Sequence, residues 1–398
     1  MTSAPKAAKA PDRETTERIV DAARAVIAER GLEGAGLRVV AERAGVSVGT
    51  INYRIGDRAA LIEAVADRET ALLEGARERW RARVGTADVL AAGLLPDLAA
   101  AWLDEGAGER RVSAIVTAEL ALAARREPEA LPGVARLLAA SEDIWRDVLA
   151  GSPGAGRLAA IVADYCFDEQ PFSILLAAET DYRLLRASTI RALLAPHWPR
   201  VSPAASRWHM QVVERLAVPS AAALDDGAPP QGLKAVIADR IGELLQAHGF
   251  ATVSHRRVAQ AVAAPVSTIA HHFPAQRDLV LGGVEAMYRS MRAALRRTDD
   301  ASAGGFGVIL LTHEAALTAL RDPALIPFAI DMRRRRAENV HMMVAKALGI
   351  EAAAARDITQ AVIMALIGQH IRLGARGEGV SLVRFAAELR DTVRSSEG

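Results

Sequence analysis

Residues 38–61 read RVVAERAGVSVGTINYRIGDRAAL, and this stretch decides the fold of the segment around it. Gly45 separates two short helical patterns, and glycine is the residue that adopts a left-handed turn most cheaply. Ser47 follows the turn and can accept a hydrogen bond from the first N–H groups of the second helix. Val40 and Val46 can fill the gap between the helices. We therefore predict a helix-turn-helix, the arrangement that lays its second helix in the major groove of DNA.

Polar side chains on the second helix suit contacts with DNA. Thr50, Asn52 and Tyr53 offer hydroxyl and amide groups for phosphates and base edges. Arg38, at the start of the preceding helix, and Arg58, at the start of the next, can flank the groove and neutralise phosphates. The predicted DNA contacts of this segment are Arg38, Ser47, Val48, Thr50, Asn52, Tyr53, Arg54 and Arg58.

A weaker echo of the motif lies in the second half of the chain. Residues 259–272 read AQAVAAPVSTIAHH and lie 218 positions after residues 41–54 (259 − 41 = 218). Two glycines that we expect to end the preceding helices, Gly31 and Gly249, differ by the same offset (249 − 31 = 218). The predicted DNA contacts of the second segment are Arg256, Arg257, Ser267, Thr268, His271 and His272.

A second pair of matching segments lies downstream. Residues 117–132, TAELALAARREPEALP, match residues 312–327, THEAALTALRDPALIP, at an offset of 195 (312 − 117 = 195). These matches indicate two diverged copies of one domain pair. Residues 217–231 lack apolar periodicity and are rich in Pro, Ala, Gly and Asp, which is typical of a linker. The predicted division is a disordered basic tail at 1–13, helix-turn-helix domains at 14–62 and 232–280, a linker at 217–231, and helical ligand-binding and interface domains at 63–216 and 281–398.

Residues 38–61 resemble the DNA-binding segment of the TetR family of bacterial transcriptional regulators. The resemblance rests on a turn glycine, Val-Ser, Gly-Thr, a tyrosine near the end of the second helix, and a basic residue three positions before a leucine. It covers roughly residues 14–65, and the echo covers 232–283. The first copy departs from the family pattern at Asn52, where a tyrosine is common, and at Ile55, where an aromatic residue is usual.

The second copy departs further from the family pattern. Ala263 stands at the turn glycine and Pro265 at the capping serine. Proline is acceptable in the first turn of a helix, and alanine costs about 1 kcal/mol if the backbone there is left-handed. Phe273 matches the family's aromatic residue. We expect the second head to fold and to read a different DNA sequence from the first.

The resemblance implies an all-α fold of two tandem units, each a DNA-binding head followed by a helical body. Members of the family act as homodimers that present two identical reading helices to a palindrome. Their last two helices form a four-helix interface, for which the candidates here are residues 155–168 with 172–195, and 352–376 with 380–394.

Both halves of such a dimer lie here in one chain, and their reading helices differ. We therefore predict a single-chain pseudo-dimer and ligand-responsive repressor that binds an asymmetric double-stranded DNA operator, with reading helices about 34–36 Å apart. In one alternative the second head has decayed, and the protein is a small-molecule sensor or interaction protein. In another the chain associates further and places four heads on a palindrome. No G-x-S-x-G, H-E-x-x-H or P-loop motif is present, so we expect no enzyme.

The resemblance also implies a small molecule that enters the helical body and changes the separation of the heads. The apolar composition favours a hydrophobic effector. The residues that could line its pocket could also be ordinary core, and if one pocket survives we favour the first copy. These residues are Trp102, Trp145, Tyr165, Phe167 and Phe172 in the first copy, and Phe328, Met332 and Met343 in the second.

Composition bounds the remaining possibilities. The net charge of the 398 residues is +1, so nucleic-acid contacts must come from local patches. Cys166, the single cysteine, excludes an intrachain disulfide and is expected to be a small buried apolar residue. The N-terminus has no apolar signal segment, and no apolar run approaches the roughly 18–20 residues of a membrane helix. We expect a cytoplasmic protein with no membrane association, metal or cofactor.

Three charged features have competing interpretations. Residues 333–336, four consecutive arginines, could bind nucleic acid, but a solvated or ion-paired helix face is the favoured interpretation. Glu119 and Glu314 recur at the offset of 195, which indicates a structural ion pair rather than a ligand contact (314 − 119 = 195). His271 and His272 have no carboxylate or cysteine nearby in sequence, so DNA contact is favoured over a metal.

Overall fold

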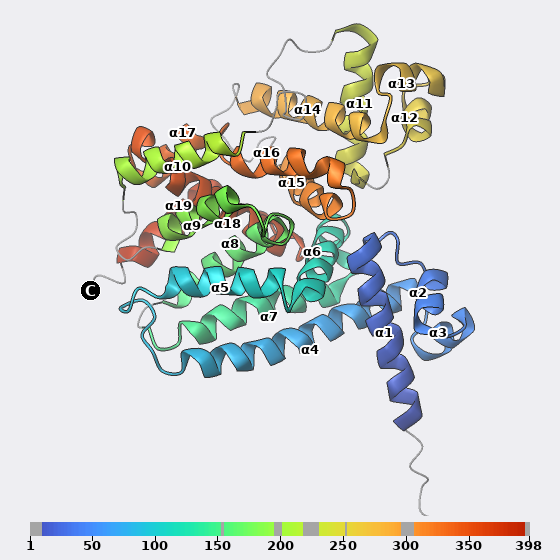
Figure 1. The fold of residues 1–398 in the computed structure, drawn as a ribbon, viewed down its shortest axis with the longest axis horizontal. Coiled ribbons are helices and arrows are strands. Elements are labelled where there is room, and N and C mark those ends of the chain that lie inside the picture. The colour runs from blue at the N-terminus through green and yellow to red at the C-terminus, as the bar shows by residue number, and fades with distance from the viewer. Residues whose placement is uncertain are drawn as a thin grey trace, which may run out of the picture.

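The prediction of an all-α fold is confirmed for the described part of the chain (Figure 1). The computed structural model describes residues 10–152, 155–194, 201–217, 231–250, 253–295 and 306–394. The helices of the first half are α1 (Ala10–Arg30), α2 (Leu37–Ala44), α3 (Val48–Arg54), α4 (Arg58–Val84), α5 (Leu95–Ala107), α6 (Arg111–Arg126), α7 (Pro132–Val148), α8 (Gly156–Leu175), α9 (Thr180–Leu194) and α10 (Pro203–Arg215). Those of the second half are α11 (Gly232–His248), α12 (His255–Ala261), α13 (Val266–His272), α14 (Gln276–Leu295), α15 (Phe306–Ala319), α16 (Ile326–Arg334), α17 (His341–Leu348), α18 (Arg356–Gly374) and α19 (Leu382–Arg394).

The first head consists of α1, α2 and α3, and it leads into the long α4. Ile19, Ala23 and Ile27 recur at helical spacing on α1 and are fully buried, and α1 packs on α2, α4 and α6. The helix ends where Gly31 takes a positive φ of 77°, as predicted. The helix begins at Ala10, so the predicted tail at residues 1–13 extends too far, because residues 10–13 already belong to α1. Pro11 lies in the first turn, where the N–H that proline lacks would have no helical partner.

The second head consists of α11, α12 and α13, followed by α14. Ile237, Ile241 and Leu245 lie four residues apart and form the buried face of α11, which packs on α14 and α15. In Figure 1 the two heads lie on the same side of the molecule, one from each half, with the helical bodies beside them. The predicted tail up to residue 9 and most of the predicted linker, residues 218–230, lie outside the described residues.

Helices α8 and α18 pack along one another and join the two halves. They approach so closely that a Cβ atom at Gly368 would overlap the backbone carbonyl of Asp164. The predicted break of the first interface helix after residue 168 is wrong, because α8 continues through Pro171 to Leu175. Phe172 and Ser173 are fully buried there, and this packing holds a helix that proline alone would interrupt. In the second half, α18 also contacts α9, whereas α19 packs mainly against α17.

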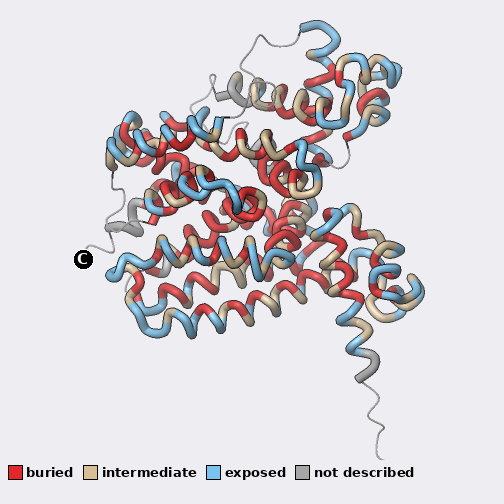
Figure 2. The backbone as a smooth tube through the Cα atoms, viewed as in Figure 1, coloured by how far each residue is buried: buried red, intermediate tan, exposed pale blue. Residues whose placement is uncertain are grey.

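The largest hydrophobic core is shared between the halves. It contains buried residues of α1 to α9 together with Val362, Ile367 and Phe385 of the second half. A second core joins the second head to α14, α15 and α16. Figure 2 shows buried positions along the central helices and exposed positions at the outer ends of both heads. No helix in the described ranges is both long and apolar enough to cross a membrane.

Candidate nucleic-acid interface and effector site

The turn between α2 and α3 has the geometry that the sequence predicts. Gly45 is left-handed, with φ 65° and ψ 38°. The N–H of Val46 donates to the carbonyl of Ala41 at 3.0 Å and closes the turn. Val40 and Ile51 are fully buried and lock α2 against α3. The turn therefore fixes the angle at which α3 leaves the head.

Ser47 caps α3, as predicted. Its hydroxyl oxygen accepts a hydrogen bond from the N–H of Thr50 at 3.0 Å, and the two hydroxyl oxygens are 2.9 Å apart. A side-chain cap of this kind satisfies one of the N–H groups that a helix start leaves unpaired. Both hydroxyls thus lie at the N-terminus of α3.

The outer face of α3 is open. Tyr53 is 86% exposed, an unusual state for a tyrosine, and Asn52 beside it is exposed as well. The guanidinium carbon of Arg54 lies 5.9 Å from the centre of the Tyr53 ring. Val48 is half-buried at the start of the helix. An aromatic ring, an amide and a cation therefore project from one short helix, as contacts with a nucleic acid require.

Two arginines flank this helix. Arg38 is exposed at the start of α2. Arg58 is exposed at the start of α4, and its guanidinium donates to the carbonyl oxygen of Leu32 at 2.9 Å. Arg58 therefore also ties α4 to the turn after α1.

The second head repeats these backbone contacts at residues 218 positions later. The N–H of Ala264 donates to the carbonyl of Ala259 at 3.0 Å, as Val46 does to Ala41. Ala263 takes φ 52°, the left-handed conformation that glycine has in the first head. Pro265 precedes α13 without a side-chain cap. The turn of the second head therefore keeps the backbone shape of the first, although a strained alanine replaces the glycine and no hydroxyl caps the following helix.

The predicted contacts of the second head are spread over α12 and α13. Arg256, Ser267 and His271 are exposed, whereas Arg257, Thr268 and His272 are half-buried. The rings of His271 and His272 meet edge to face, with centroids 5.1 Å apart. Among the described residues, no group of three or more His, Cys, Asp or Glu side chains is placed to hold a metal. At the offset of 218, His271 and His272 of α13 stand at the positions of Tyr53 and Arg54 in α3.

Three of the predicted effector residues line one small cavity in the first body. Trp102, Trp145 and Phe167 surround a space of about 50 Å³ between α4, α5, α6, α7 and α8. Trp80 of α4 completes an aromatic cluster, with its ring centroid 5.5 Å from that of Trp102 and 6.3 Å from that of Trp145. Trp80 is not among the residues predicted from the sequence, although it lies on one stripe of α4 with the buried Leu73 and Ala76.

The same cavity has a polar wall, whose residues were not predicted from the sequence either. The guanidinium of Arg110 lies 3.5 Å from the ring centre of Trp102 and donates to Glu105 at 3.2 Å. Burial lowers the pKa of Arg110, and the carboxylate of Glu105 opposes that shift. Cys166, which also lines the cavity, is buried, and burial raises the pKa of its thiol.

The other predicted effector residues lie elsewhere. Tyr165 and Phe172 are fully buried in the contact between the halves. Phe328 and Met332 belong to the core of the second head, while Met343 packs against the shared core. The three predicted residues of the second half therefore lie in two different hydrophobic cores.

Buried ion pairs join α8 to the second half. The guanidinium of Arg333 donates to both carboxylate oxygens of Glu169, the shortest contact being 2.6 Å, and both side chains are at most 1% exposed. Tyr182 and Tyr165 also donate to Glu169, at 2.7 and 3.1 Å. Burial acts to lower the pKa of Arg333, but Glu169 outweighs it and raises that pKa. Gln360 accepts a further hydrogen bond from Arg333 at 2.8 Å.

Two more pairs repeat this pattern. Arg336 donates to Asp168 at 3.0 Å, and Arg372 donates to Asp164 at 2.7 and 2.9 Å. Burial raises the pKa of Asp164 to about 6, and Arg372 opposes that rise. The expectation of ion pairs for residues 333–336 is confirmed, but that of a solvated face is wrong for Arg333 and Arg336. Arg333 and Arg336 are buried where acids of α8 face them, whereas Arg334 and Arg335 are half-buried and pair with Asp331 and Glu338 of their own half.

A family model described as bacterial regulatory proteins, tetR family, matches residues 19–65. The match contains the whole of α2 and α3 and ends inside α4, so it coincides with the first head. It supports a DNA-binding transcriptional regulator of the TetR family. No curated protein matches the chain significantly.

Proposed function

We propose that this chain, a DNA-binding regulator with a TetR-type head at residues 19–65, acts as a single-chain pseudo-dimer on an asymmetric operator. The observation that carries the proposal is the repetition of one turn geometry in two heads with different outer side chains. Val46 and Ala264 make the same closing hydrogen bond, and Gly45 and Ala263 take the same left-handed conformation. Because the two heads share one backbone geometry but differ in their outer side chains, we expect them to bind two half-sites of different sequence.

The distribution of charge between the halves supports pairing within one chain. In the pairs Glu169–Arg333, Asp168–Arg336 and Asp164–Arg372, the acid belongs to the first half and the arginine to the second. Pairing two first halves by the same surface would bury these carboxylates without the arginines that pair with them, which is strongly unfavourable. The first half is therefore matched to the second half rather than to a copy of itself.

The cavity in the first body supports regulation by a small ligand. An aromatic cluster with one buried cation suits an apolar molecule that carries an acceptor group toward Arg110. The space of about 50 Å³ is far below the ~300 Å³ of an ordinary ligand pocket. A ligand would have to separate α4 from α6, and both helices pack on α1 of the first head. Binding would thus act on the head and release the DNA.

Selection of binding sites from random DNA tests the proposal. We expect the selected operator to contain two unlike half-sites, and operators built from either half-site twice to bind more weakly. Tyr53→Ala should weaken protection of one half-site and His271→Ala that of the other. A selected palindrome would contradict two distinct readers, and the absence of any salt-sensitive DNA binding would favour a sensor with decayed heads.

A further inference from the structure

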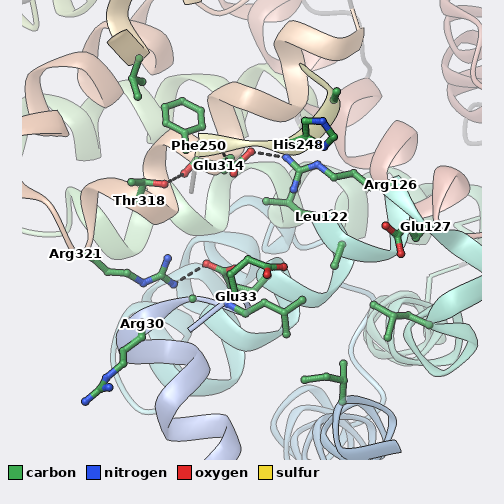
Figure 3. Close-up of a pocket in the computed structure, with 18 of the residues that line it drawn as sticks. Arg30, Glu33, Leu122, Arg126, Glu127, His248, Phe250, Glu314, Thr318 and Arg321 are labelled. Atoms are coloured by element: carbon green, nitrogen blue, oxygen red, sulfur yellow. Dashed lines mark hydrogen bonds and ion pairs between the residues drawn. The ribbon is translucent and has the colours of Figure 1, made fainter. Parts of the chain in front are cut away.

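Two ion pairs cross between the halves directly beside the heads (Figure 3). Arg321, in the turn that follows α15, donates to Glu119 of α6 at 2.6 Å. Arg126 at the C-terminal end of α6 donates to Glu314 of α15 at 2.5 Å. The four side chains are between 14% and 28% exposed, so each pair is partly shielded from water. The structural interpretation of Glu119 and Glu314 is confirmed.

The arrangement is reciprocal. Glu314 lies 195 residues after Glu119, and Arg321 lies 195 residues after Arg126 (314 − 119 = 195; 321 − 126 = 195). Each glutamate thus contacts the counterpart of its own half's arginine. Such an exchange of equivalent contacts is the pattern of an interface with twofold symmetry.

Each glutamate also binds the head of its own half. Glu119 accepts a hydrogen bond from the N–H of Leu32 at 3.2 Å, and Glu314 accepts one from the N–H of Phe250 at 2.7 Å. Leu32 and Phe250 are themselves 218 residues apart and follow the first helix of their heads (250 − 32 = 218). Arg321 further donates to the carbonyl oxygen of Ile27 in α1 at 3.4 Å. One ion pair therefore links a head, its own body and the body of the other half.

The turns of the heads are shaped for this contact. A Cβ atom at Gly31 would lie 3.0 Å from Nη1 of Arg321, and one at Gly249 would lie 2.8 Å from Nη2 of Arg126. Both glycines have a positive φ, 77° and 78°. Glycine at these positions lets the guanidinium of the opposite half approach the backbone of the head.

Elsewhere the two heads are separated by open space. A cavity of about 790 Å³ lies between α1, α4 and α6 of the first half and α11, α14 and α15 of the second. Both ion pairs border it, as do Leu32 and Phe250. Because side chains do not fill this space, the crossed pairs carry much of the resistance to movement of one head relative to the other.

We propose that the crossed pairs Glu119–Arg321 and Glu314–Arg126 set the separation of the two reading helices, and hence the half-site spacing that the protein accepts. This rests on the proposed function, since only a protein that reads two half-sites has a spacing to set. Arg126 and Arg321 are positioning residues: neither touches α3 or α13, and each acts through the turn after α1 or α11.

Distance measurement between spin labels tests the inference without DNA. Glu42→Cys and Gln260→Cys place labels on equivalent exposed positions of α2 and α12, and the native Cys166 is buried (260 − 42 = 218). We expect a single narrow distance distribution that becomes broader when Arg126→Gln and Arg321→Gln are combined.

Two control variants show whether a broader distance distribution results from loss of the fold. Arg126→Lys with Arg321→Lys keeps both charges and should keep the distribution narrow. Arg136→Gln removes the exposed ion pair with Asp67 on the body and should leave the distribution unchanged. If the doubly neutral variant retains the wild-type distribution, the crossed pairs do not set the separation and the inference fails.

An operator series separates this inference from the proposed function. One added base pair moves a half-site by about 3.4 Å along the DNA and about 35° around it. We expect such operators to bind the wild type at least about tenfold more weakly than the selected operator, and the doubly neutral variant less than about threefold more weakly. Equal spacing preferences would overturn the inference alone. If the wild type binds no DNA but the distance distribution between the labels still broadens in the doubly neutral variant, the proposed function alone is overturned.

Discussion

Replacing Arg333 by methionine removes the cation at the centre of the contact between the halves. The side chain is 1% exposed and holds both oxygens of Glu169. Methionine fills similar space but donates no hydrogen bond, so Arg333→Met leaves the buried carboxylate of Glu169 without its cationic partner. Tyr165 and Tyr182 would continue to donate to Glu169, because both come from the first half.

The size of the effect follows from these contacts. Breaking a buried ion pair by removing one partner costs about 3–5 kcal/mol. Two tyrosine donors remain on the carboxylate, which places the expected loss near 3 kcal/mol of unfolding free energy. Combining Arg333→Met with Glu169→Gln removes the stranded charge, so we expect the double variant to recover about 2 kcal/mol of that loss.

Urea unfolding followed by circular dichroism measures these values. The matched control is Arg136→Met, which breaks an ion pair whose partners are 62% and 65% exposed and should cost less than about 1 kcal/mol. A loss for Arg333→Met no larger than that of the control would refute the reasoning. So would a double variant less stable than Arg333→Met alone.

Three further predictions follow from single positions. Gly368→Ala should lower the unfolding free energy by about 2 kcal/mol, because the new Cβ atom would overlap the backbone of α8. Gly75→Ala in α4 is the control: it meets no such overlap and should raise the unfolding free energy by about 1 kcal/mol through its better helix propensity. Ala263→Gly should stabilise the second head and Gly45→Ala destabilise the first, each by about 1 kcal/mol in thermal unfolding, since both backbones are left-handed. Burial lowers the pKa of His209 from 6.5 to about 3, so the unfolded chain takes up the proton first and stability is lost as the pH falls below 6.5. Between pH 7 and 5 the share of His209 in this loss is about 2 kcal/mol (1.5 × 1.36), and His209→Gln should remove that share in urea titrations at both pH values, while His370, whose pKa burial lowers to about 4, keeps its own share.

The first head was predictable because its local signals agree. Gly31 ends a helix, Gly45 forms a left-handed turn and Ser47 caps the next helix, and each depends on the backbone of a few neighbouring residues. The departure at Ala263 was visible as a replacement of glycine, and the backbone there is indeed left-handed. Local sequence and final fold do not conflict at these positions.

Features that depend on distant contacts were not predictable. The sequence predicts a solvated or ion-paired face for residues 333–336, but nothing in their neighbourhood shows that acids of α8, 164 or more positions earlier in the chain, meet Arg333 and Arg336 in a buried contact. Pro171 indicates a helix end by itself, yet packing on both sides keeps α8 continuous. Trp80 of α4 meets the ring of Trp102 of α5 only after these two helices pack together.

The number of chains bound to one operator distinguishes a single-chain pseudo-dimer from a dimer of two chains. Native mass spectrometry of the protein mixed with its selected DNA should show one chain bound to one duplex, with an asymmetric footprint that covers both half-sites. Two chains on one palindromic duplex, with the second heads away from the DNA, would contradict the single-chain pseudo-dimer.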